Sequence, residues 1–178
     1  MSGRFLYFAY GSNMLTERLR ARCPGAEPVA VAVAEDYRLI LSLPGGGPSG
    51  KAGIVRRQSA SVHGVLYELA VADAMALDAH EGPSYRRVGE FAVGGRRLVA
   101  AMTYLPVEAV LRETLAPFDW YRALVLAGAL QHGLDAAHVA AIAAVAAIPD
   151  PEPERPQRLA AIAALEAAGH AELIARPD

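Results

Sequence analysis

Two short stretches of the sequence carry residue types suited to acid–base and anion-binding chemistry. In the first, FAYGSNM (residues 8 to 14), apolar strand-forming residues end in Gly11, Ser12 and Asn13, and helix-forming sequence follows at once. A strand, a small polar turn and a helix start bring backbone N–H groups and a positive helix end to one place. This arrangement suits a carboxylate or a polarised carbonyl oxygen, and Gly11 would let a ligand approach the backbone closely. The alternative is that Ser12 or Asn13 only caps the helix.

The second stretch is LDAHEGPSY, which places Glu81 in the last turn of a short predicted helix that Gly82-Pro83 ends. Carbonyl groups point outward at a helix C-terminus, where negative charge is disfavoured by about 0.3–1 kcal/mol. Glu81 is therefore either an ordinary solvated carboxylate or a group with a raised pKa that carries a proton. Together, the two stretches predict acid–base chemistry on an amino-acid-like substrate.

Other reactive residue types fall in patterns that predict no chemistry. GGGPSGKA (45 to 52) resembles a phosphate-binding loop, but Ala52 replaces the Ser or Thr that would hold magnesium, and a strand-like segment follows. We interpret it as a loop between strands, and Lys51→Ala is expected to leave turnover unaffected. Cys23 follows a predicted helix, where a thiolate is disfavoured, so it is interpreted as a packing residue. The histidines show no metal-ligand spacing, and no metal site is predicted; they are His63, His80, His132, His138 and His170.

The elements that must position these residues indicate an α+β fold. Helices are predicted at 14–23, at 71–81 and, rich in alanine, from Trp120 onward, with a proline-rich break at 149–156. Strand-like runs lie at 4–10, 29–34, 37–43, 52–57, 61–69, 85–93 and 96–105, the last two joined by Gly94-Gly95 as a hairpin. About six or seven strands predict a small mixed β-barrel, closed or nearly closed, flanked by helices and followed by a helical C-terminal segment. Residues 1–178 are expected to form a single domain.

Composition limits the classes of partner. With 17 basic and 19 acidic residues, the formal net charge of −2 predicts no nucleic-acid binding. The longest apolar run, at 139–148, is too short to span a membrane. The single cysteine excludes an internal disulfide and suits a reducing compartment, so a cytoplasmic location is expected. The expected partners are a small molecule and, because the Ala-rich tail permits it, a second copy in a homodimer.

Four blocks of the sequence resemble the γ-glutamylcyclotransferase family, in the same order. They are FLYFAYGSNM, HGVLYEL, LDAHEGPSYRRV and WYRALVLAGALQHGL, and the resemblance extends from Arg4 to about Leu134. It implies a small β-barrel with flanking helices, an acid/base role for Glu81 and substrate contact by Tyr121. The substrate loop of the family falls on Tyr7, Phe8, Ala9, Tyr10, Gly11 and Ser12, with Asn13 completing the signature.

The reaction that the resemblance implies is intramolecular and needs no cofactor. The α-amine of a γ-glutamyl group attacks its own γ-carbonyl, giving 5-oxoproline and the released amine. The substrate would be a γ-glutamyl amino acid or peptide. Two alternatives stay open: a relative acting on another γ-glutamyl amide, such as a γ-glutamylamine, a biosynthetic intermediate or glutathione, and a binding module without turnover. The segment between Glu81 and Tyr85 is shorter than is common in the family, which bears on substrate preference.

Overall fold

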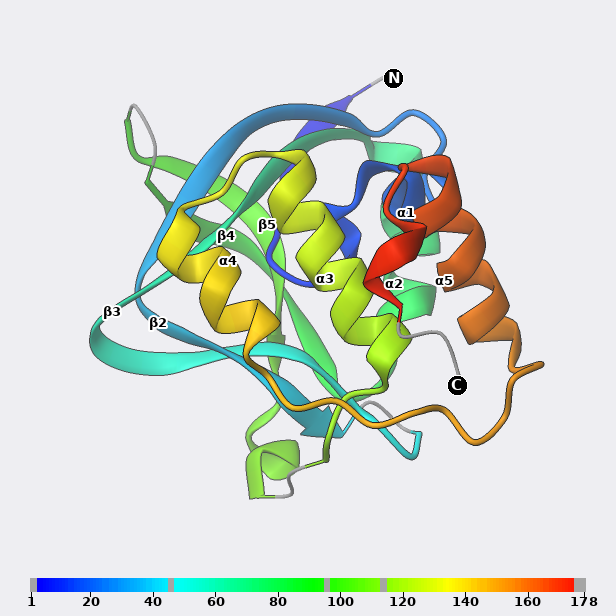
Figure 1. Ribbon diagram of the computed structural model, residues 1–178. Helices are drawn as coiled ribbons and strands as arrows, with labels where there is room; N and C mark the ends of the chain where they lie inside the picture. Colours follow the sequence, from blue (N-terminus) through cyan, green and yellow to red (C-terminus); the bar gives the residue numbers. More distant parts are fainter. Residues whose placement is uncertain (1–2, 45–46, 95–96, 113–114, 175–178) are drawn as a thin grey trace.

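The computed structural model describes residues 3–44, 47–94, 97–112 and 115–174 and consists of a curved sheet with helices packed against it (Figure 1). The strands are β1 (Arg4–Ala9), β2 (Glu27–Pro44), β3 (Gly50–Ala70), β4 (Tyr85–Val93) and β5 (Val99–Pro106). The helices are α1 (Thr16–Arg20), α2 (Ala74–Glu81), α3 (Asp119–Gln131), α4 (Ala136–Ala143) and α5 (Pro156–Ala167). Short 3₁₀ turns are η1 (Ser12–Met14), η2 (Val71–Asp73), η3 (Glu108–Arg112) and η4 (Ala171–Leu173).

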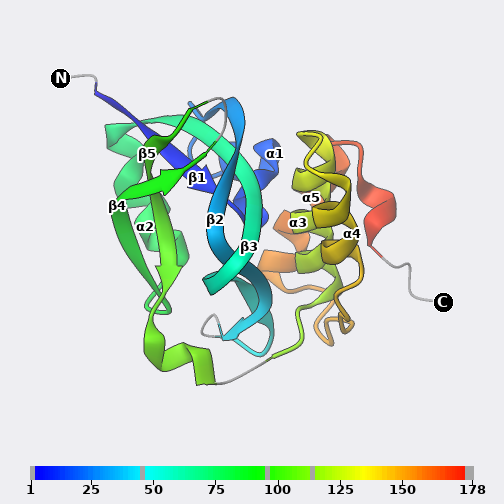
Figure 2. The same cartoon turned by 90° about the vertical axis from the view of Figure 1, so that its left-hand side faces the viewer.

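The sheet is mixed and has the strand order β2-β3-β1-β5-β4. The central strand β1 pairs antiparallel with β3 and parallel with β5, and its second half is buried, as expected for an apolar strand inside a sheet. Helices α3, α4 and α5 lie together on one side of the sheet (Figure 2). This arrangement confirms the predicted α+β class and the mixed character of the sheet.

The prediction of six or seven strands was wrong, because two predicted breaks are irregularities inside long strands. The runs 29–34 and 37–43 both belong to β2, and 52–57 and 61–69 both belong to β3. Asp36 and Ser59 have positive φ angles of 60° and 62°, and Asp36 Oδ1 accepts a hydrogen bond from the Ser59 N–H at 2.9 Å. The register between the strands shifts at this place, so the chain bends without leaving the sheet. The described residues therefore contain five strands.

The edges of the sheet touch without closing a barrel. Val33 of β2 and Gly94, just after β4, exchange two backbone hydrogen bonds of 2.7 Å. Beyond that single bridge, β4 pairs with β5 and not with β2 in the part of the chain that the structure describes. The expected closed or nearly closed barrel is thus a sheet curled until its edges meet at one point. The antiparallel β4–β5 pair confirms the predicted hairpin, although Gly95 lies outside the described residues.

The predicted helix cap at Ser12 or Asn13 was also wrong. Residues 12–14 form the 3₁₀ turn η1, closed by a hydrogen bond from the Met14 N–H to the Gly11 carbonyl at 2.9 Å. Helix α1 begins only at Thr16, after Leu15, and no side chain caps it. The side chains of Ser12 and Asn13 are therefore free for other contacts, although both are buried.

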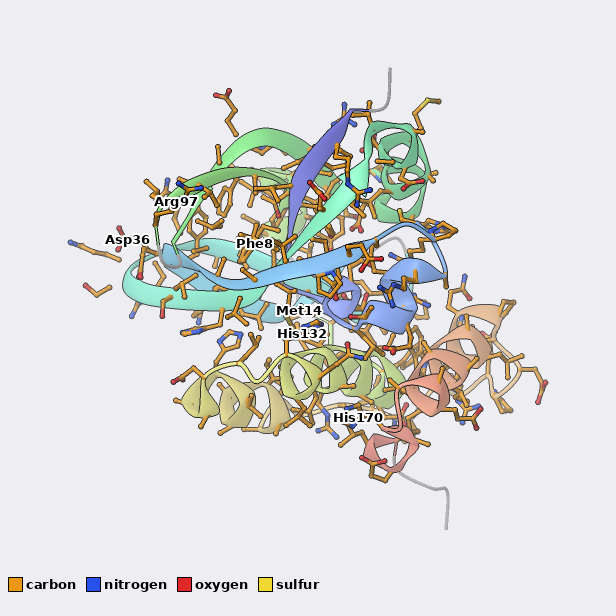
Figure 3. All side chains as sticks on the ribbon, turned by 90° about the horizontal axis from the view of Figure 1, so that it is seen from above. Phe8, Met14, Asp36, Arg97, His132 and His170 are labelled. Carbon is orange, nitrogen blue, oxygen red and sulfur yellow. The ribbon has the colours of Figure 1, made fainter. Side chains whose placement is uncertain are left out.

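Helix α3 packs against the η1 turn. Figure 3 shows Met14 and His132 close together at the junction of the turn and α3. Tyr67 connects them, because its hydroxyl donates to the Met14 carbonyl at 2.7 Å and lies 3.0 Å from His132 Nε2. Gly128 faces the same turn, and a Cβ atom there would lie 2.6 Å from the Leu15 nitrogen and 2.7 Å from the Met14 carbonyl carbon. The turn is thus held between the sheet and α3.

Replacing Gly128 by alanine should destabilise the protein although alanine favours helices. The helix-propensity gain is about 1 kcal/mol, whereas overpacking against atoms that cannot rotate away costs about 1–3 kcal/mol. We expect a lower midpoint of urea unfolding and weaker activity, because the turn must shift. Gly25→Ala is the control, since a Cβ atom at Gly25 would meet nothing within 4 Å. Equal unfolding midpoints for the two variants would contradict this account of the turn.

Candidate active site

A cavity of about 280 Å³ opens beside the η1 turn and the end of α2, and a narrower space continues it inward. Ser12, Glu81, Tyr85 and Tyr121 line both parts. We call the narrower part the inner compartment; it is also lined by Tyr7, Tyr10, Gly11, Asn13, Ala52 and Tyr104. The wider part is the outer compartment, whose lining includes Arg18, Arg22, Lys51, His80, Trp120 and Arg155. The cavity is lined by most of the residues predicted for the site, namely Tyr7, Tyr10, Gly11, Ser12, Asn13, Glu81 and Tyr121.

Phe8 and Ala9 do not line either compartment with their side chains. Both are buried in the core, where the Phe8 ring stacks on Phe91 with 6.1 Å between ring centroids. They belong to the strand β1 that carries the chain into the site. Substrate contact by their backbone stays a prediction.

Glu81 is the last residue of α2, as predicted, and its carboxylate faces Asn13. Gly82 ends the helix with a φ of 68°, a left-handed conformation that suits glycine. Glu81 Oε1 accepts a hydrogen bond from Asn13 Nδ2 at 3.0 Å and lies 3.9 Å from Arg22 Nη1. Only 17% of the Glu81 side chain is exposed, so it is not the solvated surface carboxylate of the simpler interpretation.

Burial raises the pKa of Glu81 above its ordinary value. The charge of Arg22 and the hydrogen bond from Asn13 favour the ionised form, but they only partly offset the cost of burial. A raised pKa is a property that a carboxyl group needs in order both to accept and to return a proton.

Asn13 joins three groups of the site in one network. Its Oδ1 accepts from Arg22 Nη1 at 2.8 Å, and its Nδ2 donates to the Tyr7 hydroxyl at 3.0 Å as well as to Glu81. Because arginine can only donate, the amide oxygen must face Arg22 and the NH₂ group must face the carboxylate. The amide thus fixes the position of Glu81.

Three tyrosines of the site are anchored to the backbone. The Tyr10 hydroxyl donates to the Tyr104 carbonyl at 2.5 Å, and the Tyr85 hydroxyl donates to the Ala52 carbonyl at 2.6 Å. The Tyr121 hydroxyl accepts from the Ala52 N–H at 2.9 Å. Burial raises the pKa of Tyr10, Tyr85 and Tyr121, so these groups are neutral walls of fixed position.

The expected helix dipole is absent from the anion site. Helix α1 has only five residues and starts after the turn, so the GSN segment is not the start of a regular helix. What remains of the prediction is that Gly11 and Ser12 line the inner compartment together with Glu81.

Sequence reasoning missed the cations and aromatic groups of the outer compartment. Lys51 is the clearest case: it lies in β3 and not in the predicted loop, and its Nζ lies 4.4 Å from the Tyr121 ring centroid and 4.7 Å from that of Trp120. Because Lys51 lines the outer compartment, its position does not support the expectation that Lys51→Ala leaves turnover unaffected. A local signal did exist for Arg18 and Arg22, because their i, i+4 spacing directly after the turn places them on one side.

The described residues contain neither a clustered metal site nor a membrane-spanning helix. No group of three or more His, Cys, Asp or Glu residues there is placed to hold a metal ion. Within the same ranges, no helix has the length and apolar character needed to cross a membrane.

A largely buried carboxylate with a raised pKa, held by an amide beside a tyrosine-walled cavity, is an arrangement suited to acid–base chemistry. The family model described as γ-glutamyl cyclotransferase, AIG2-like, matches residues 7–122. The chain is 29% identical to a γ-glutamylcyclotransferase of Bos taurus and 32% identical to that of Homo sapiens, with 73% of this chain and 72% of the relative covered in each case. A solved γ-glutamyl cyclotransferase structure superposes with a TM-score of 0.79 at 26% identity, covering 88% of this chain and 96% of the other. The chain therefore belongs to the γ-glutamyl cyclotransferase, AIG2-like family, which is a family of enzymes.

Proposed function

We propose that this enzyme converts a γ-glutamyl amino acid or peptide to 5-oxoproline and a free amine, with Glu81 as the acid/base group. The observation that carries the proposal is the position of Glu81. It is buried, held by Asn13 and Arg22, and shared by both compartments of the cavity. A substrate extending from the inner to the outer compartment would pass directly over its carboxylate.

In the proposed reaction, Glu81 moves one proton. Its carboxylate takes a proton from the α-ammonium group of the substrate, and the freed amine attacks the γ-carbonyl carbon. A carbon–nitrogen bond forms and closes the five-membered ring, and the original amide bond breaks. Glu81 then gives the proton to the departing nitrogen, and the ring nitrogen passes its second proton to the released amine, which becomes an ammonium ion. The enzyme thus ends in its starting state.

The remaining contribution of the protein is position and charge stabilisation. Both reacting groups belong to one substrate, so proximity is built in once the glutamyl chain is folded into the reactive shape. The backbone N–H groups of Gly11 and Ser12 are proposed to donate to the oxygen that becomes negative during the attack. Neutral tyrosines on the inner walls restrict the glutamyl chain without competing for the proton. No step calls for a cofactor.

The proposal is tested by measuring 5-oxoproline release from a panel of γ-glutamyl dipeptides. Release that follows the amount of active enzyme supports the proposal. Release only from a γ-glutamylamine or another amide would favour the second hypothesis. Binding of a γ-glutamyl compound without release from any panel member would make the protein a binding module.

The role of Gly11 is best tested with a pair of variants. Gly11 has a φ of −117°, so the backbone does not require glycine, but an added Cβ atom would lie 2.8 Å from the Ala52 Cβ. Gly11→Ala should therefore weaken 5-oxoproline binding by about tenfold, since an overpacked wall costs about 1–3 kcal/mol. Adding Ala52→Gly removes the clashing methyl group and should restore the fold.

The paired variant separates packing from ligand contact at Gly11. If the added methyl group blocks the ligand itself, calorimetric titration with 5-oxoproline will show weak binding even in the double variant. Full recovery of binding would instead assign Gly11 to packing against Ala52 alone, and would remove the argument that its backbone faces the ligand.

A further inference from the structure

The outer compartment is lined by more cations than carboxylates. Arg18, Arg22, Lys51 and Arg155 all line it, and Glu81 is the acidic residue among its described lining residues. Glu81 also lines the inner compartment, whereas these four cations line the outer compartment alone. The two compartments therefore present different chemistry to the two ends of a substrate.

Two of these cations have carboxylates of the protein beside them. Arg22 lies 3.9 Å from Glu81 and donates to Asn13 Oδ1 at 2.8 Å. Arg155 makes ion pairs with Asp150 at 2.8 Å and with Glu152 at 2.9 Å, and the Asp150 side chain is fully buried. Both arginines are therefore engaged within the protein, although Arg155 Nη2 has no hydrogen-bond partner among the described residues.

Arg18 and Lys51 have no carboxylate within ion-pair distance in the described ranges 3–44, 47–94, 97–112 and 115–174. The buried Nε of Arg18 also has no hydrogen-bond partner there. Lys51 rests on the faces of Tyr121 and Trp120, and its Nζ donates to Ser49 at 3.2 Å. Burial, and after it the charges of Arg18 and Arg155, lower the pKa of Lys51 to about 8.

We propose that Arg18 and Lys51 form an anion subsite that selects substrates by the charge of the released amine. This inference rests on the proposed function, because it assigns the outer compartment to the part of the substrate that leaves. Amino acids with a free carboxylate are accepted, acidic ones best, and amines without an anionic group, such as a lysine ε-amine or a polyamine, are rejected. An unpartnered guanidinium and an ammonium held on two aromatic faces are suited to carboxylate oxygens.

Matched substrates isolate the leaving group from the rest of the molecule. γ-Glutamyl-alanine and γ-glutamyl-alaninamide differ only in the carboxylate of the released amine, and γ-glutamyl-glutamate and γ-glutamyl-glutamine differ only in its side-chain charge. All four keep the α-carboxylate of the γ-glutamyl group. We expect kcat/KM to be about ten- to hundredfold higher for the alanine than for the alaninamide compound, the usual value of a hydrogen bond to a charged group. A smaller preference in the same direction is expected for glutamate over glutamine.

Charge-removing variants assign the preference to the two residues. Lys51→Met and Arg18→Met keep an unbranched apolar stem and lose the cation. Each should lower kcat/KM for γ-glutamyl-alanine by about tenfold or more and leave that for the alaninamide within about twofold. Arg57→Met, at an exposed position of β3, is the matched control and should change neither.

The outcomes separate this inference from the proposed function. If no member of the panel yields 5-oxoproline, the proposed function fails. If 5-oxoproline is released at equal kcat/KM from the alanine and alaninamide compounds, the function stands and the anion subsite is refuted. The same refutation follows if Lys51→Met and Arg18→Met slow both compounds equally, since the cations would then serve the glutamyl α-carboxylate or the fold.

Discussion

Glu81→Gln should slow 5-oxoproline release by about 10²–10⁴-fold, the usual share of general acid–base catalysis. Glutamine keeps the size of the side chain, and its Oε1 can still accept from Asn13, but it cannot take a proton from the substrate. Affinity for 5-oxoproline should be nearly unchanged. Glu81→Asp should also be strongly impaired, because it withdraws the carboxylate by one methylene group from the reacting atoms.

The stability of Glu81→Gln shows whether the rate loss is chemical. Because the pKa of Glu81 is raised in the folded protein, folding favours its protonated form, and that contribution is lost as the pH rises through the folded pKa. Glutamine resembles the protonated form, so at pH 7 the variant should melt at the same temperature as the wild type or higher. Glu90→Gln, at an exposed position of β4, should match the wild type in rate. A Glu81→Gln enzyme with most of its turnover would place the proton carrier elsewhere.

Local signals in the sequence located the main elements of the site. The apolar run of β1, the GSN turn and the Gly82-Pro83 stop each depend on neighbouring residues, and each lies where the sequence predicts it. The same local rules failed for the cap. Asn13 is a favoured capping residue, but its amide bonds to Arg22, to Tyr7 and to Glu81, which is 68 residues away in the chain. Contacts with residues distant in the sequence thus take the place of the local cap, and a local sequence pattern does not predict such contacts.

The strand count failed for a similar reason. The polar residues around Asp36 and Ser59 predicted turns that would separate two strands on each side. In the structure both residues have positive φ angles at one bulge, and β2 and β3 each continue through it. The outer compartment was missed because its cations come from distant segments: Arg18 from α1, Lys51 from β3 and Arg155 from the residue that precedes α5. The packing of α5 against α1 and α3, and of Lys51 on Trp120 and Tyr121 of α3, brings them together.

Asn13→Leu should lower kcat by about ten- to hundredfold, because a hydrogen bond to a charged group is lost from the acid/base residue. Asn13 and Arg22 both lower the pKa of Glu81 against the effect of burial, so removing the amide should raise that pKa further. The acidic limb of the wild-type kcat profile is expected above the ordinary glutamate value of about 4.3, and it should move to higher pH in Asn13→Leu. A variant that only loosened the fold would lose rate without moving the limb.

The second readout is a double-mutant cycle. Once Glu81 is glutamine, Asn13→Leu should lower kcat by a much smaller factor than it does in the wild type, since the two residues act as a unit. Full additivity together with an unmoved limb would show that Asn13 does not position Glu81.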